Sequence, residues 1–364
     1  MYDLTSFDSL ELKPDYKDTI RRFDAFWNGD IVDRPIVRIS APRDQAPPGE
    51  RALPDDRYPA EEPFTDNYYT RIHEPVDEVV RGLTNNAYGR VYLGEALPQP
   101  YLSFGCDEIA AFCGGTLSFT EDDHETCWSD PFVEDWDEFM PIKLLEDNAL
   151  WLRMQELMDK CAAAMEGKML FSPMDLHTNA DLLLALRGAE KLCLDLKDRP
   201  GVVDICMEQT MDVFKEIFGR GYKRYNLPGV NGVHLQCDFS CMISTDMFRR
   251  FVLPYLEREA EYFNKRVFYH WDGVNALTHT DDLIASKGLY LMAFVPGAGR
   301  GGHPDFLELY EKIQKRGKAV SVWGNADEAK FMHKRLKPEK TVYDVHVGSE
   351  REGVELLKWF KDNT

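Results

Sequence analysis

The segment Tyr269-His270-Trp271-Asp272-Gly273 carries side chains that can do chemistry at the end of an apolar run. His270 and Asp272 are two residues apart, so on an extended strand they point to the same side. A neutral imidazole and a carboxylate on one side can hold a divalent metal, or act as a general base and the group that orients it. In the other interpretation, Asp272 accepts a hydrogen bond from a loop N–H group and His270 is an ordinary strand-end residue.

Two further residues could complete a metal site with this pair. His346 lies at the end of the last predicted strand, near the rim if the strands close into a barrel. Cys237 follows another apolar run, where a thiolate could bind zinc, although packing in the core is the commoner use of such a thiol. The predicted metal ligands are therefore His270, Asp272, His346 and Cys237, with zinc as the expected metal.

Carboxylates and imidazoles also follow other predicted strands. His234 and Asp238 share one side of an extended run, and Asp238 stands at its end. Asp175 and His177 follow another run, where a functional role and simple hydrogen bonding within a loop are equally open. We assign catalysis to Asp238, Asp175 and Tyr269, and substrate binding to His177, Trp271, Arg300 and His234.

Arg300 belongs to the glycine-rich segment Gly297-Ala298-Gly299-Arg300-Gly301-Gly302. Backbone N–H groups in such a loop could form an anion-binding nest beside the arginine. A plain loop without a ligand explains the same residues equally well.

Eight apolar runs predict β-strands, and helical patterns lie between them. Most runs are continuous rather than alternating, which is typical of parallel strands covered on both faces. Eight βα units in 364 residues favour a closed (β/α)8 TIM barrel over an open doubly wound sheet. Catalytic side chains of such a barrel lie at the carboxyl ends of the strands. The eight runs are 35–40, 90–94, 169–174, 232–238, 266–272, 291–296, 319–324 and 341–347.

The chain is predicted to form one α/β barrel domain over residues 35–364, preceded by a helical extension over residues 1–34. Residues 41–66 are rich in proline and charge, which predicts an irregular surface loop. Two helix starts are also predicted. Asp147 is expected to cap one helix, and Ser349 with Glu352 predicts a capping box at the last helix.

The composition excludes several classes of protein. Lys and Arg total 43 against 63 Asp and Glu, and the net charge of −20 disfavours nucleic acid and anionic lipid as partners. No run approaches the length of a membrane span, and the N-terminal residues do not resemble a signal peptide. The eight cysteines have irregular spacing, which indicates free thiols in a reducing cytoplasm.

Four segments resemble the uroporphyrinogen decarboxylase superfamily. HLQCDFSCMISTDMFRRFVLPYLE is similar to a strand that ends in Asp, followed by a serine-capped helix with an internal Pro-Tyr. LLLALRGAEKLCLDLKDRPGVV resembles the G-x-E-x-L-x-x-D-L-x-x-x-P helix pair. VFYHWDG stands where relatives carry His-x-Cys-Gly, and WNGDIVDRPIV resembles the start of some members. The similarity covers most of residues 20–364 and implies a (β/α)8 barrel.

The superfamily contains metal-free decarboxylases and cobalamin-dependent methyltransferases that bind zinc through His-x-Cys and a distant Cys. The arginine-rich M-R-Q-A-G-R-Y loop of true decarboxylases is missing, because the corresponding region reads PIVRISAPRDQ. In the methyltransferase pattern, His270 takes the His position, Asp272 replaces the first Cys, and His346 lies near the place of the second.

The resemblance therefore implies an enzyme that moves a methyl group between a small methylated substrate and a corrinoid protein. One alternative is metal-free decarboxylation of a polycarboxylate in porphyrin biosynthesis, with Arg38, Arg43 or Arg300 gripping carboxylates. Another is a barrel that binds a small molecule without catalysis. The sequence leaves open whether two copies form a homodimer.

Overall fold

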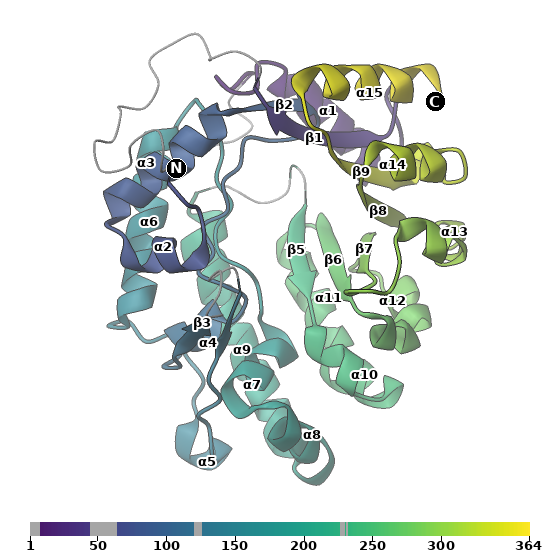
Figure 1. Cartoon of the computed structure of the whole chain (residues 1–364). Helices are drawn as coiled ribbons and strands as arrows, with labels where there is room; N and C mark the ends of the chain where they lie inside the picture. Colours follow the sequence, from purple (N-terminus) through teal and green to yellow (C-terminus); the bar gives the residue numbers. More distant parts are fainter. Residues whose placement is uncertain (1–7, 44–63, 120–125, 226–229, 231) are drawn as a thin grey trace. The chain divides into compact units, whose positions relative to one another are not determined.

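The computed structural model describes residues 8–43, 64–119, 126–225, 230 and 232–364. Most of the predicted loop 41–66 lies outside these residues. The chain divides into two compact units, each built from separate segments (Figure 1). Unit 1 comprises Met1–Leu102, Glu156–Ser172 and Gly302–Thr364, and unit 2 comprises Ser103–Gln155 and Pro173–Gly301.

Unit 1 contains four strands in the hydrogen-bonded order β2-β1-β9-β8. β9 is parallel to both of its neighbours, whereas β2 runs antiparallel to β1, with Arg38 opposite Gly94. The antiparallel strand departs from the uniformly parallel arrangement that the sequence predicts. Its elements are α1 (Tyr16–Trp27), β1 (Ile36–Pro42), α2 (Tyr68–His73), α3 (Val76–Tyr88), β2 (Arg90–Gly94), η5 (His303–Phe306), α13 (Leu307–Lys315), β8 (Ala319–Gly324), α14 (Ala326–His333), η6 (Pro338–Lys340), β9 (Thr341–His346) and α15 (Glu350–Asp362).

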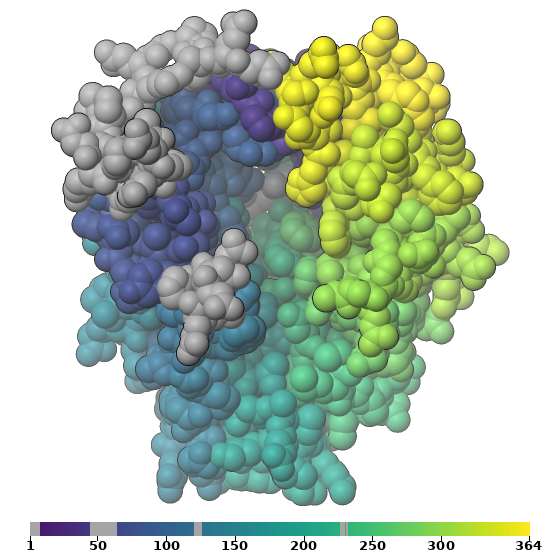
Figure 2. All heavy atoms as spheres, viewed as in Figure 1, coloured from purple at the N-terminus to yellow at the C-terminus, as the bar shows by residue number. Residues whose placement is uncertain are grey.

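The last helix, α15, packs closely on β1 and β2 because Gly353 has no side chain. A Cβ atom there would lie 2.6 Å from Leu93 and 3.1 Å from Ile39. Ser349 caps the helix by accepting from the N–H of Glu352, but the Glu352 carboxylate accepts from Gly348 rather than from Ser349. The predicted capping box is thus only half formed. Figure 2 shows α14 and α15, in yellow-green and yellow, on the surface of unit 1.

Unit 2 contains the parallel strands β5, β6 and β7, in which Gln236 lies opposite His270 and Asp272 opposite Val295. The short strands β3 and β4 form a separate antiparallel pair. The elements of unit 2 are α4 (Glu108–Phe112), β3 (Leu117–Phe119), β4 (Cys127–Ser129), α5 (Trp136–Phe139), α7 (Asn179–Arg187), α8 (Ala189–Asp198), α9 (Pro200–Ile217), η2 (Phe218–Lys223), β5 (Val233–Gln236), η3 (Asp238–Met242), α10 (Thr245–Phe251), α11 (Leu253–Tyr262), β6 (Val267–Asp272), η4 (Val274–His279), α12 (Thr280–Ala285) and β7 (Leu291–Val295).

The run 169–174 was predicted as a strand but forms only an isolated parallel bridge between Tyr101 and Ser172. Leu170 and Ser172 donate their N–H groups to the carbonyls of Pro98 and Pro100. Prolines have no N–H group to donate in return, so a regular ladder cannot form along this segment. The other seven predicted strands are confirmed. The described residues therefore show a mostly parallel α/β fold but no closed ring of eight strands.

The long helix α6 (Ala149–Met165) begins one residue later than its predicted cap implies. Asn148, not Asp147, accepts hydrogen bonds from the N–H groups of Leu150 and Trp151, each at 3.0 Å. An amide oxygen at this position satisfies N–H groups that have no partner within the helix. None of the described helices is both long and apolar enough to span a membrane.

Candidate active site

Strand β6 presents two different faces at the end where chemistry was predicted. His270 and Asp272 are partly exposed and alternate with Tyr269 and Trp271, which are fully buried. The first two residues therefore share one side of the strand, and the two aromatic residues occupy the other. The indole of Trp271 donates to the carbonyl of Ala276 at 3.1 Å. Tyr269 and Trp271 thus belong to the packed side and do not share a face with His270 and Asp272.

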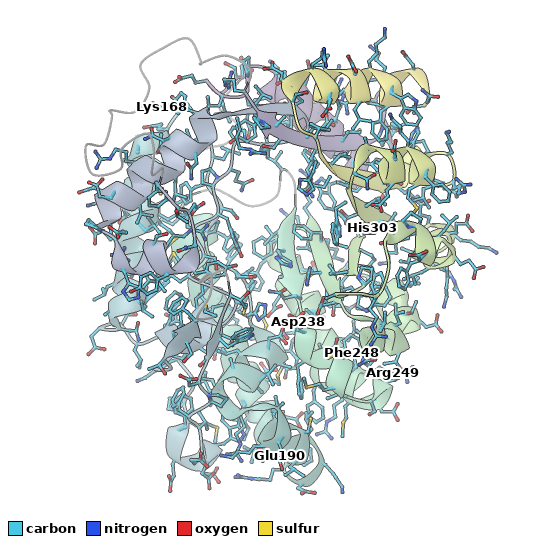
Figure 3. The ribbon with its side chains drawn as sticks, in the orientation of Figure 1. Lys168, Glu190, Asp238, Phe248, Arg249 and His303 are labelled. Carbon is cyan, nitrogen blue, oxygen red and sulfur yellow. The ribbon has the colours of Figure 1, made fainter. Side chains whose placement is uncertain are left out.

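His177 lies among aspartates that come from distant parts of unit 2. Its Nδ1 is 3.7 Å from Oδ1 of Asp107, and its Nε2 is 4.0 Å from Oδ2 of Asp238. The residue is only 8% exposed. Asp107 precedes α4, whereas Asp238 begins η3 just beyond β5, where Figure 3 labels it. The fold therefore brings residues 107, 177 and 238 together. We call these three residues, with Asp175 and Asp181, the His177 cluster.

The charges of the His177 cluster favour its acid form. Burial alone would lower the pKa of His177, but Asp175, Asp181, Asp238 and Asp107 together raise that pKa to about 9. Burial, and then the charge of Asp181, raise the pKa of Asp238 to about 7, against the opposing effect of His177. The cluster therefore places an imidazole with a raised pKa 4.0 Å from a carboxyl group with a raised pKa.

A buried carboxyl group, that of Glu108, holds the backbone of Asp175 by a hydrogen bond. Glu108 is fully buried, and its two oxygens accept from the N–H groups of Asp175 at 2.7 Å and Phe104 at 2.8 Å. The side chain of Asp175 accepts from the amide of Gln236 at 2.8 Å. These contacts fix the carboxylate of Asp175 from both its backbone and its side chain.

The imidazoles of His234 and His270 form a neighbouring pair. Their ring centres are 5.0 Å apart, and His234 also stacks on Phe268 at 4.9 Å. Burial lowers the pKa of His234 to about 4 and also lowers the pKa of His270. Nδ1 of His234 lies 3.8 Å from Asp175. Burial thus favours the neutral form of these two imidazoles, whereas the surrounding aspartates favour the charged form of His177.

The four predicted metal ligands are divided between the two units, with His270, Asp272 and Cys237 in unit 2 and His346 in unit 1. Cys237 is 2% exposed, and burial raises the pKa of its thiol well above the usual value. His346 lies at the exposed end of β9 in unit 1. Over the described ranges, no group of three or more His, Cys, Asp or Glu side chains has the arrangement of a metal site. Zinc therefore stays a prediction from the sequence, and we derive no chemical step through a metal.

Arg300 occupies an exposed position in the loop after β7. Gly297, Gly299 and Gly301 have φ angles of +91°, +72° and +95°, which only glycine adopts readily. The backbone conformation of the loop therefore explains why every second residue from 297 to 301 is glycine.

Sequence reasoning missed Asp107, Asp181, Gln236 and Glu108. Asp107 and Asp181 are separated from Asp238 by 131 and 57 residues, so their spacing in the chain gives no sign that they meet. Asp181 lies in the first turn of α7, where an acidic residue is common for a purely structural reason.

Comparisons with known proteins support the fold. No known family model and no curated protein matches the sequence. Among solved structures, a methyltransferase from Methanosarcina mazei is similar over 94% of this chain and 98% of its own, with a TM-score of 0.60. The chain folds like this methyltransferase. The two sequences are 12% identical, so the likeness concerns the fold and assigns no residue a role.

A second buried carboxyl group, Glu259 of α11, holds the turn that carries His177 into place. Its oxygens accept from the hydroxyl of Thr178 at 2.6 Å and from the amide of Asn179 at 3.3 Å. Asn179 has a φ angle of +50° and also donates to the carbonyl of Gln236. The side chains around Glu259 therefore keep the 177–181 segment in an uncommon backbone conformation.

Glu259→Gln is expected to remove a pH dependence of stability. Burial raises the pKa of Glu259 from 4.5 to about 8, so the folded protein retains a proton that the unfolded chain loses. This contribution is complete below pH 4.5 and is lost as the pH rises towards 8, by at most about 1.4 kcal/mol per pH unit. Urea unfolding at pH 5, 6, 7 and 8 measures it. Exposed Glu261 on the same helix provides the control Glu261→Gln, and equal pH slopes for wild type and Glu259→Gln would contradict the assignment.

Proposed function

We propose that this protein is a methyltransferase-like enzyme that moves a methyl group from a small methylated substrate to a corrinoid protein. The observation that carries the proposal is the geometry of the His177 cluster, in which Nε2 of His177 lies 4.0 Å from Asp238 and the pKa of each group is raised. The fold of a solved methyltransferase supports the same class of reaction.

The reaction needs a proton at the atom that loses its methyl group. The bond between the methyl carbon and the substrate's oxygen or nitrogen breaks, and its electron pair stays on that atom. A corrinoid, when bound through a partner protein, supplies the nucleophile that takes the methyl carbon. Asp238 donates its proton to the leaving atom, and the imidazolium of His177 stabilises the carboxylate that Asp238 becomes. Asp175, held by Gln236 and Glu108, is placed to orient the substrate.

The charge of the site argues against the decarboxylation alternative. A polycarboxylate needs cationic groups, and it would meet several aspartates beside one imidazolium. Two of the arginines proposed to grip it have other partners. Arg38 pairs with Asp344 at 2.6 Å, and Arg43 donates to the carbonyls of Tyr88 and Arg90. The aspartates in question are Asp107, Asp175, Asp181, Asp238 and Asp272.

A methyl-transfer assay tests the proposal. Purified protein is incubated with chemically reduced cobalamin and a panel of methoxylated and methylated small molecules. We expect methylcobalamin, followed by its absorbance, and an equal amount of demethylated product, identified by mass spectrometry. A parallel incubation with uroporphyrinogen is expected to give no loss of carboxyl groups. Decarboxylated product, or tight binding of panel compounds without any turnover, would overturn the proposal.

A further inference from the structure

Asp181 of α7 makes an unusual set of contacts beside the acid pair. It is 1% exposed, and its two carboxylate oxygens accept from the backbone N–H groups of Asp238 at 3.0 Å and Phe239 at 2.9 Å. Both N–H groups lie at the start of η3, where the chain leaves β5. One buried carboxylate therefore fixes the backbone from which the side chain of Asp238 extends.

The negative charge of Asp181 also acts on the pair. It raises the pKa of Asp238 and, together with Asp175, the pKa of His177. The structure shows no Lys or Arg paired with Asp181 among the residues it describes, so His177 is the cation that balances it. The other titratable groups that interact with the pair are Asp107, Asp175, Asp272, Cys106, Cys237, Cys241, Tyr269, His234 and His270.

We infer that Asp181 is a positioning residue: its carboxylate holds the backbone N–H groups of residues 238 and 239, and it thereby sets the carboxyl group of Asp238 against His177. The inference deepens the proposed function and rests on it, because only the proposed reaction uses that proton. Asp181 itself is 1% exposed and holds two backbone N–H groups, so we assign it a role through Asp238 and none of its own on the substrate.

Two substitutions separate the charge of Asp181 from its geometry. Asp181→Asn keeps the size of the side chain but removes the charge, and it replaces one of the two accepting oxygens by an NH2 group, which cannot accept from a backbone N–H group. Asp181→Glu keeps the charge but adds a methylene, which moves the carboxylate away from the fit that both N–H groups require. Asp246→Asn, at an aspartate that is 94% exposed on α10, is the matched control.

The experiment is an NMR pH titration of ¹³C-labelled histidine side chains in the full chain, with His177 assigned by His177→Gln. We expect Asp181→Asn to lower the midpoint of His177 by about one pH unit or more, and Asp181→Glu and Asp246→Asn to leave it near the wild-type value. An unchanged midpoint in Asp181→Asn, or an equal fall in Asp181→Glu, would overturn the inference. If Asp181→Asn does not fold, the turnover of Asp181→Glu decides the positioning role.

A second readout concerns the rate. In the methyl-transfer assay, Asp181→Glu is expected to lower turnover at least tenfold while the His177 midpoint is kept, because the acid is present but displaced. Wild-type turnover in that variant would overturn the positioning role. The titration requires no turnover, so a failed methyl-transfer assay would leave the electrostatic part of the inference standing and would refute only the proposed function.

Discussion

Asp238→Asn is expected to lower the turnover of methyl transfer by about 10²- to 10⁴-fold, because an amide cannot deliver the proton that the leaving atom needs. The substitution keeps the size of the side chain, and the backbone N–H of residue 238 can still donate to Asp181. The loss is therefore expected in kcat, with little change in KM. Steady-state kinetics with the best substrate of the panel measure both values.

The pH profile provides an independent check on the same proton. The pKa of Asp238 is raised to about 7, so its acid form is present below that value and is lost as the pH rises through it. The turnover of the wild type should therefore fall as the pH rises through about 7. The turnover of Asp238→Asn should not show this fall. Asp246→Asn makes the same change of charge at an exposed site and is expected to match wild type. A variant Asp238→Asn that keeps more than a tenth of the wild-type kcat would refute the acid role.

Much of the fold was predictable because its signals are local. Continuous apolar runs separated by helical patterns predict seven of the strands, since burial on both faces leaves its mark within each run. The remaining run, 169–174, is equally apolar, yet its partner segment contains Pro98 and Pro100. The strand prediction fails because of the prolines in the partner segment, and the sequence of a run does not show which segment will pair with it.

The arrangement of site residues was predictable only where those residues lie on one strand or helix. The spacing of His270 and Asp272 correctly predicts that they share a side of β6, since a strand alternates its side chains. The His177 cluster is different, because it joins the N-cap of α4, the 175–181 segment and the end of β5. Its chemistry depends on which carboxylates surround one imidazole, and that arrangement arises only when distant segments pack.

Glu95→Ala is expected to destabilise unit 1 by about 3–5 kcal/mol, because it leaves a buried guanidinium without its counter-charge. Glu95 is fully buried and receives two hydrogen bonds from Arg34, at 2.5 and 2.9 Å, and a third from the N–H of Val37 at 3.0 Å. Arg34 is itself only 8% exposed. Urea unfolding followed by circular dichroism measures the loss. Asp8→Ala breaks the exposed pair with Lys17 and is expected to cost less than about 1 kcal/mol.

A double variant separates two free energies: the cost of leaving the Arg34 charge buried without a partner, and the net contribution of the ion pair to stability. Burying two charges costs free energy that their attraction only partly offsets, so a buried pair can often be replaced by apolar residues of similar size. Arg34→Met combined with Glu95→Met is therefore expected to recover most of the stability that Glu95→Ala loses. If the double variant is as unstable as Glu95→Ala, the loss comes from the unpaired N–H of Val37 and from packing, and the buried charge of Arg34 does not explain it.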